Sequence, residues 1–145
     1  MVSILIIGHG NYATGALSAT RLVAGAPDNV YALDFVEGMA PDELKEKMSA
    51  LLASIPEKEV LVMADLAGGT PFRTAVELKM GGETGKDIRV VAGTNMPALM
   101  EAAFSSDSMS LAELAADVVT TGVEGVMDWD AQSDDSEEPE FEGGL

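Results

Sequence analysis

The chain has 145 residues, a hydrophobic fraction of 47% and a net charge of −17, with no cysteine and one histidine. This length predicts one domain with a buried core, and the missing cysteines exclude disulfides and thiolate zinc sites. The single histidine argues against a catalytic metal site, and the acidic balance argues against binding to nucleic acid or anionic membranes. We therefore expect no metal, no cofactor and no nucleic-acid partner.

Short apolar runs alternate with helical patterns along the first hundred residues. The runs are rich in Val, Ile and Leu and are mostly continuous, which is typical of strands buried on both faces. The predicted strands are 2–7, 30–35, 60–64 and 88–92, and the predicted helices between them are 12–24, 41–54 and 71–80. This alternation predicts an α/β fold with an open, mainly parallel, doubly wound sheet.

Two further helices are predicted after the fourth strand. One begins at Pro97, and the other follows a capping box formed by Ser110 and Glu113, with Gly122 as its stop. The segment from Val123 to Met127 then predicts a short fifth strand at a sheet edge. Residues 1–127 form the predicted folded domain. Residues 128–145 contain eight acidic residues and no basic one, and they are predicted to be a disordered tail.

The apolar runs are too short to cross a membrane, because none approaches the roughly eighteen residues that a spanning helix requires. The chain also passes from Met1-Val2-Ser3 into its first strand without a basic signal region. We expect a protein that is neither exported nor inserted into a membrane, and that is located in the cytoplasm.

The single histidine, His9, lies between Gly8 and Gly10 at the end of the first predicted strand. In an open parallel sheet, reactive groups gather beyond the carboxyl ends of the strands, near the point where the strand order reverses. An imidazole with a reference pKa of about 6.5 is largely neutral near pH 7 and can act as a nucleophile. His9 is therefore the candidate nucleophile.

Asp65 follows the third predicted strand, and a glycine loop then leads to a helix whose predicted N-cap is Thr70. A carboxylate that accepts one imidazole N–H fixes the tautomer and leaves the other ring nitrogen free to attack. Free backbone N–H groups at a helix N-terminus favour a phosphate. We predict that His9 and Asp65 are catalytic. The candidate phosphate donors are Gly10, Gly68, Gly69 and Thr70.

Four motifs at successive strand ends resemble the enzyme IIA component of the mannose-type (mannose, fructose and sorbose) sugar phosphotransferase system. They are Ile-Gly-His-Gly at 7–10, Asp-Phe-Val-Glu-Gly at 34–38, Asp-Leu-Ala-Gly-Gly-Thr-Pro-Phe at 65–72 and Ala-Gly-Thr-Asn-Met-Pro at 92–97. The resemblance covers about residues 1–127. It implies a phosphotransferase component that accepts a phosphoryl group on His9 from the histidine phosphocarrier protein. The group then passes to the IIB component of a sugar transporter, and Asp65 is the carboxylate partner of His9.

The same resemblance implies a cytoplasmic homodimer that exchanges an edge strand between subunits, for which Val123 to Met127 is the candidate here. The chain departs from the family pattern at Asn11 and Ala67, where the family carries aromatic residues, and Tyr12 is the candidate replacement for the first of these. These departures bear on the choice of partner and sugar.

Three other functions stay open at this point. A phosphocarrier of this class could serve a dihydroxyacetone kinase or a regulatory partner. A small nucleotide-binding oxidoreductase is suggested by Gly8-x-Gly10-x-x-Ala13, which follows a strand and opens a helix, with Asp34 as the ribose-binding acid. A non-catalytic interaction protein would use its acidic tail to bind a basic partner.

Overall fold

A computed structural model describes residues 1–132. These residues form four strands and five helices in regular alternation until the last two helices. In chain order the elements are β1 (Ser3–His9), α1 (Tyr12–Ala24), β2 (Val30–Phe35), α2 (Pro41–Ser54), β3 (Glu59–Ala64), α3 (Thr70–Gly81), β4 (Asp87–Val91), α4 (Met96–Ser105) and α5 (Leu111–Glu124).

The strands form one sheet in the order β2-β1-β3-β4, and all three neighbouring pairs are parallel. The chain moves from β1 to β2 on one side and then crosses to β3 on the other side of β1. The strand order therefore reverses between β1 and β3, where Ile7 lies beside Ala64. Ligands of open α/β sheets bind beyond the carboxyl ends of the strands at such a point.

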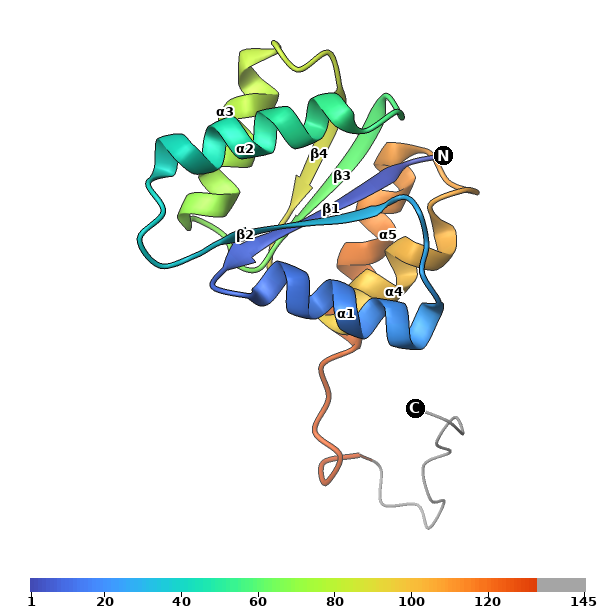
Figure 1. Cartoon of the computed structure of the whole chain (residues 1–145). Helices are drawn as coiled ribbons and strands as arrows, with labels where there is room; N and C mark the ends of the chain where they lie inside the picture. Colours follow the sequence, from blue (N-terminus) through green and yellow to red (C-terminus); the bar gives the residue numbers. More distant parts are fainter. Residues whose placement is uncertain (133–145) are drawn as a thin grey trace.

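Helices cover both faces of the sheet, with α1, α4 and α5 on one face and α2 and α3 on the other (Figure 1). Successive residues of β1 point to opposite faces, so Ile4 and Ile6 join the first core while Leu5 and Ile7 join the second. All four side chains are fully buried. This two-sided burial explains why β1 reads as a continuous apolar run.

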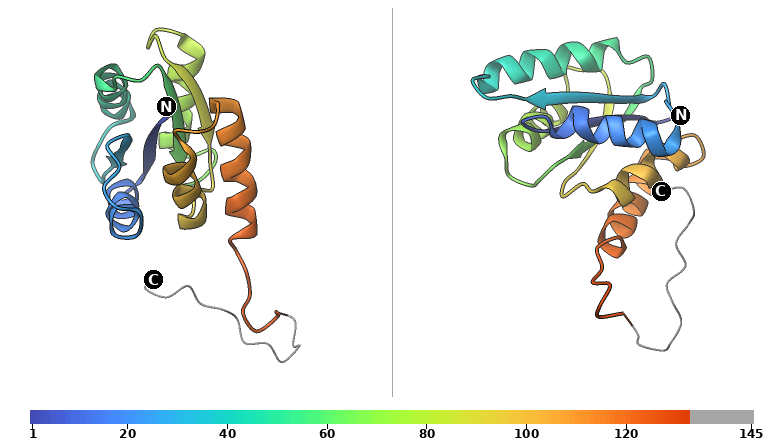
Figure 2. Two further views of the ribbon diagram at one scale, coloured as in Figure 1. Left: turned by 90° about the vertical axis from the view of Figure 1, so that its right-hand side faces the viewer. Right: turned by 60° about the horizontal axis from the view of Figure 1, so that its bottom comes forward.

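The predicted doubly wound α/β class is confirmed, and the observed elements follow the predicted ranges closely. The prediction of a fifth strand at Val123 to Met127 is wrong for the described residues. Val123 and Glu124 form the last residues of α5, Gly125 lies in a turn, and residues 126–128 have no regular structure. The chain then leaves the body of the protein as an extended segment (Figure 2).

Gly122 does not stop α5 as predicted, because a tertiary contact explains this glycine instead. A Cβ at Gly122 would lie 3.2 Å from the Cβ of Ala98 and 3.3 Å from the Oδ1 of Asn95. The Gly122 carbonyl also accepts a hydrogen bond of 2.9 Å from the Asn95 side chain. Gly122 therefore permits close packing of α5 on the start of α4, and the helix continues to Glu124.

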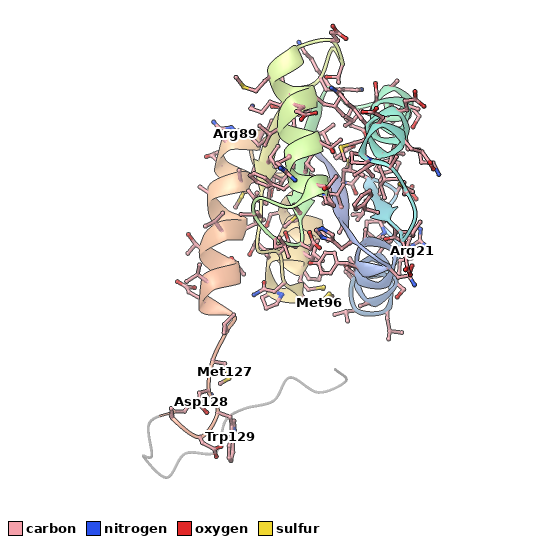
Figure 3. All side chains as sticks on the ribbon, turned by 90° about the vertical axis from the view of Figure 1, so that its left-hand side faces the viewer. Arg21, Arg89, Met96, Met127, Asp128 and Trp129 are labelled. Atoms are coloured by element: carbon pink, nitrogen blue, oxygen red, sulfur yellow. The ribbon has the colours of Figure 1, made fainter. Side chains whose placement is uncertain are left out.

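The predicted tail, residues 128–145, lies largely outside the described residues, since 133–145 are not described. The part that is described, 128–132, contains no helix or strand. Met127 and Trp129 lie away from the folded body (Figure 3), and both side chains are exposed. No helix within residues 1–132 is long and apolar enough to span a membrane.

Candidate active site

His9 and Asp65 meet at the point where the strand order reverses. His9 ends β1, Asp65 directly follows β3, and the Asp65 N–H donates to the carbonyl of Ile7 at 3.1 Å. The Oδ2 atom of Asp65 lies 2.8 Å from His9 Nδ1 and accepts the backbone N–H of His9 at 3.0 Å. The predicted proximity of the two residues is confirmed, because parallel pairing of β1 with β3 places their carboxyl ends side by side.

Asp65 is held in its ionised form by the donors around it. Burial of the side chain raises its pKa, but this effect is outweighed by hydrogen bonds from the His9 N–H, the His9 ring and the Leu66 N–H, together with the charge of His9. The net result is a pKa below the ordinary value for aspartate. An ionised carboxylate can only accept hydrogen bonds, so the proton between the two side chains belongs to His9 Nδ1. In the neutral ring, the Nε2 atom of His9 then carries the free lone pair.

The imidazole of His9 is fixed in position yet reachable from solvent. Its side chain is 45% exposed, compared with 12% for Asp65. The ring of Phe35, at the end of β2, meets it edge to face with 6.0 Å between ring centroids. Within residues 1–132 no group forms a hydrogen bond with Nε2. This ring can therefore present Nε2 to an electrophile while Asp65 holds its opposite nitrogen.

The start of α3 lies against the His9 ring, because a Cβ at Gly69 would stand 3.2 Å from Nε2. Gly68 has φ +82°, and the helix N-cap is Gly69, one residue earlier than the predicted N-cap, Thr70. Thr70 is instead the first residue of the helix. In the described part of the chain the N–H groups of Gly68, Gly69 and Thr70 have no acceptor. Three unpaired donors at a helix N-terminus are suited to a phosphoryl group.

The prediction that Gly10 belongs to this donor set is wrong. Its N–H donates to the carbonyl of Phe35 at 2.8 Å, which ties the turn after β1 to the end of β2. Gly10 has φ +59°, a conformation that favours glycine. The residue shapes the turn that carries His9, and its N–H is already occupied.

The features that suggested a dinucleotide site have other uses in this structure. Asp34 accepts the N–H of Thr14 at 3.0 Å and its hydroxyl at 2.6 Å, and so caps the first turn of α1. A Cβ at Gly8 would lie 2.5 Å from Tyr12 Cδ1, so the space beside this glycine is filled by an aromatic ring. Both carboxylate oxygens of Asp34 and the space beside Gly8 are therefore already used within the protein.

Two contributions to the site are missing from the sequence-based prediction. Phe35 belongs to one of the recognised motifs, but its contact with the His9 ring depends on the β1–β2 pairing. The hydroxyl of Tyr12 donates to the carbonyl of Thr94 at 2.6 Å, across 82 positions of the chain. Within residues 1–132 no group of three or more His, Cys, Asp or Glu side chains could hold a metal ion.

Known proteins resemble this chain over most of its length. The model of the EIIA-man family, described as "PTS system fructose IIA component", matches residues 3–119. The chain belongs to the mannose-type IIA family of the phosphotransferase system. The residues matched to this IIA family include β1, β3, both candidate catalytic residues and the glycine loop.

Individual relatives support the assignment to the IIA family. The chain is 32% identical over 117 residues to the fructose-specific EIIA component of Bacillus subtilis, covering 79% of this chain and 77% of that protein. It is 37% identical over 127 residues to the mannose-specific EIIAB component of Escherichia coli K12, covering 86% of this chain but only 38% of that longer protein. A crystal structure of an EIIA component from Streptococcus agalactiae superimposes with a TM-score of 0.82 at 35% identity, covering 90% of this chain and 98% of that one.

Proposed function

We propose that this IIA component carries a phosphoryl group on His9 Nε2. It accepts the group from the histidine phosphocarrier protein and passes it to the IIB component of a sugar transporter. Because both exchanges involve cytoplasmic phosphoproteins, the proposal places the protein in the cytoplasm. The observation that carries the proposal is the His9–Asp65 pair, with Nδ1 held at 2.8 Å and Nε2 left free.

The chemistry follows from this arrangement. The lone pair of Nε2 attacks phosphorus and forms the new N–P bond, while the N–P bond of the donor breaks and its electron pair returns to the donor imidazole. Asp65 keeps the proton on Nδ1 and offsets the positive charge that develops on the ring of His9. The N–H groups of Gly68, Gly69 and Thr70 stabilise the charge on the transferring group. Transfer to the IIB component is the same step in reverse, with the acceptor nitrogen as nucleophile.

The proposal is tested by incubating the full chain with phosphoenolpyruvate, enzyme I and the histidine phosphocarrier protein, followed by intact mass measurement. The expected product carries one phosphoryl group that is labile to acid and stable to alkali, as a phosphohistidine should be. Addition of a IIB component should then remove it. Since His9 is the only histidine, His9→Gln should remain unmodified. A phosphorylated His9→Gln protein would contradict the assignment.

We also propose that the protein is a homodimer. Strand β4 lies at one edge of the sheet, and within the described residues no strand pairs with its outer side. The segment after α5 exposes three apolar side chains, Val126, Met127 and Trp129, of which Val126 is 77% and Trp129 57% exposed. An unpaired strand edge and exposed apolar side chains both favour association with a second copy. The exchanged segment would lie in 126–132, since Val123 and Glu124 belong to α5.

A further inference from the structure

A series of contacts joins the β4–α4 loop to the candidate active site. The hydroxyl of Tyr12, in the first turn of α1, donates to the carbonyl of Thr94 at 2.6 Å. The N–H of Thr94 in turn donates to the carbonyl of Ala64 at 3.1 Å. Ala64 is the last residue of β3 and directly precedes Asp65. Tyr12 is therefore linked through Thr94 to the backbone that carries the catalytic carboxylate.

The aromatic ring of Tyr12 closes this series at its other end. It lies so close to Gly8 that a Cβ there would stand 2.5 Å from Cδ1 and 2.9 Å from Cγ. Gly8 directly precedes His9, whose Nδ1 lies 2.8 Å from Asp65. The contacts thus form a closed circuit that runs through the carboxyl ends of β1 and β3 and the loop after β4, with the His9–Asp65 pair as one of its links.

The Tyr12 hydroxyl remains a donor under ordinary conditions. Burial raises the pKa of Tyr12, and the negative charge of Asp65 raises it further. The phenol is therefore protonated at neutral pH and well above it. Its hydrogen bond to the Thr94 carbonyl is retained throughout this pH range. The contact is also nonlocal, because it joins residues 82 positions apart.

We propose that Tyr12 is a positioning residue for phosphoryl acceptance. Its ring supports the Gly8–His9 peptide and its hydroxyl holds the Thr94 loop, so that the two ends of the circuit keep His9 Nδ1 on Asp65. Tyr12 acts through Gly8 and Thr94 and does not touch the phosphoryl group. The inference rests on the proposed role of His9, and it adds a residue that lies in α1 and outside the glycine loop.

The decisive variant is Tyr12→Phe, which keeps the ring and removes only the hydroxyl. Its matched control is Tyr31→Phe, because Tyr31 on β2 is the other tyrosine of the chain and its hydroxyl has no partner among residues 1–132. Phosphorylation of His9 is measured with two donors, the phosphorylated histidine phosphocarrier protein and the small molecule phosphoramidate. Misplacing a catalytic group slows its reaction steeply, so Tyr12→Phe should be roughly tenfold slower than Tyr31→Phe with both donors.

A second readout does not depend on phosphoryl transfer. Because His9 is the only histidine, its ring ¹⁵N signals in an NMR spectrum need no separate assignment. Tyr12→Phe should reduce the population with the proton on Nδ1 relative to the wild-type protein, while Tyr31→Phe should match the wild type. If the wild-type protein accepts no phosphoryl group, the proposed function fails, and the ring signals alone decide the positioning role of Tyr12.

Gly8→Ala disturbs the same contact from the opposite side, because the added methyl group pushes the Tyr12 ring while the hydroxyl is retained. It should shift the His9 signals in the same direction, and it decides the question if Tyr12→Phe does not fold. Three results would overturn the proposal. These are a Tyr12→Phe rate within a factor of about two of the control, slowing with the protein donor alone, and slowing with unchanged His9 ring signals.

Discussion

The imidazole of His9 lies directly against the backbone of Gly69. A Cβ built on Gly69 would stand 2.6 Å from Cε1 and 3.2 Å from Nε2 of the histidine ring. The φ of Gly69 is −77°, which any residue can adopt, so its backbone conformation does not require glycine. Gly69 is needed because the ring occupies the space of a side chain. The free ring nitrogen is thereby brought to the start of α3.

Gly69→Ala should slow phosphorylation of His9 by about ten- to a hundredfold, because the new methyl group must displace the ring from its position. Gly81→Ala is the matched control at the other end of α3, since a Cβ at Gly81 meets no atom within 4 Å. Rapid-quench phosphorylation of the two variants checks the expectation. Equal rates would mean that the ring adjusts without cost.

Asp65→Asn should slow phosphorylation by about 10²- to 10⁴-fold, because an amide can donate to Nδ1 and stabilise the wrong tautomer. Asp87→Asn is the control, because it makes the same charge change at the exposed first residue of β4. This variant should react like the wild type. Both variants are compared by their rates of single-turnover phosphoryl transfer from the histidine phosphocarrier protein. A normal rate with Asp65→Asn would leave His9 acting without a carboxylate.

The contribution of Asp65 to folding should depend on pH in a defined direction. Its native pKa is lower than the reference value of 3.8, so its ionised form stabilises the folded state fully above pH 3.8. This stabilisation is lost as the pH falls through the lower native pKa. The difference in unfolding free energy between the wild type and Asp65→Asn should therefore be constant near neutrality and shrink below about pH 4. Urea titrations at several pH values test this, and a difference that grows on acidification would contradict it.

Asp34→Ala should destabilise the fold by about 0.5 to 2 kcal/mol, because it leaves the N–H of Thr14 in the first turn of α1 without its cap. Transfer to His9 should change by no more than a few-fold at temperatures where the variant is folded. Thermal melting and transfer kinetics measured on the same sample separate the two effects. Loss of transfer without loss of stability would instead assign Asp34 to the reaction.

Dimerisation should be visible through Trp129, the only tryptophan in the chain. If the segment after α5 docks on a second copy, sedimentation should give twice the mass of one chain, and dilution should shift the Trp129 emission to the red. Trp129→Ser should weaken association by at least about 2 kcal/mol, because a buried tryptophan is commonly a dominant contact of an interface. A monomer at all concentrations would reject the dimer.

Much of this protein can be predicted from local sequence. The buried strands are continuous apolar runs, and the start of α5 is marked by the Ser110–Glu113 capping box, which forms as expected. The sequence indicates His9 and Asp65 because each follows an apolar run, and parallel strands place such residues at one edge of the sheet. These features depend on neighbours within a few positions, which a sequence displays directly.

The remaining features were decided by tertiary contacts. Gly122 has the local signature of a helix stop, yet it lies inside α5 because Asn95 and Ala98 occupy the space beside it. Gly10 resembles a phosphate donor, but pairing of β1 with β2 gives its N–H to Phe35. The sequence by itself determined the layered fold and the pair of catalytic candidates, because periodicity and strand ends are local properties. Only the folded chain decided which ring nitrogen is free, which N–H groups remain unpaired and why Tyr12 reaches Thr94, because each depends on atoms that are distant in sequence and adjacent in space.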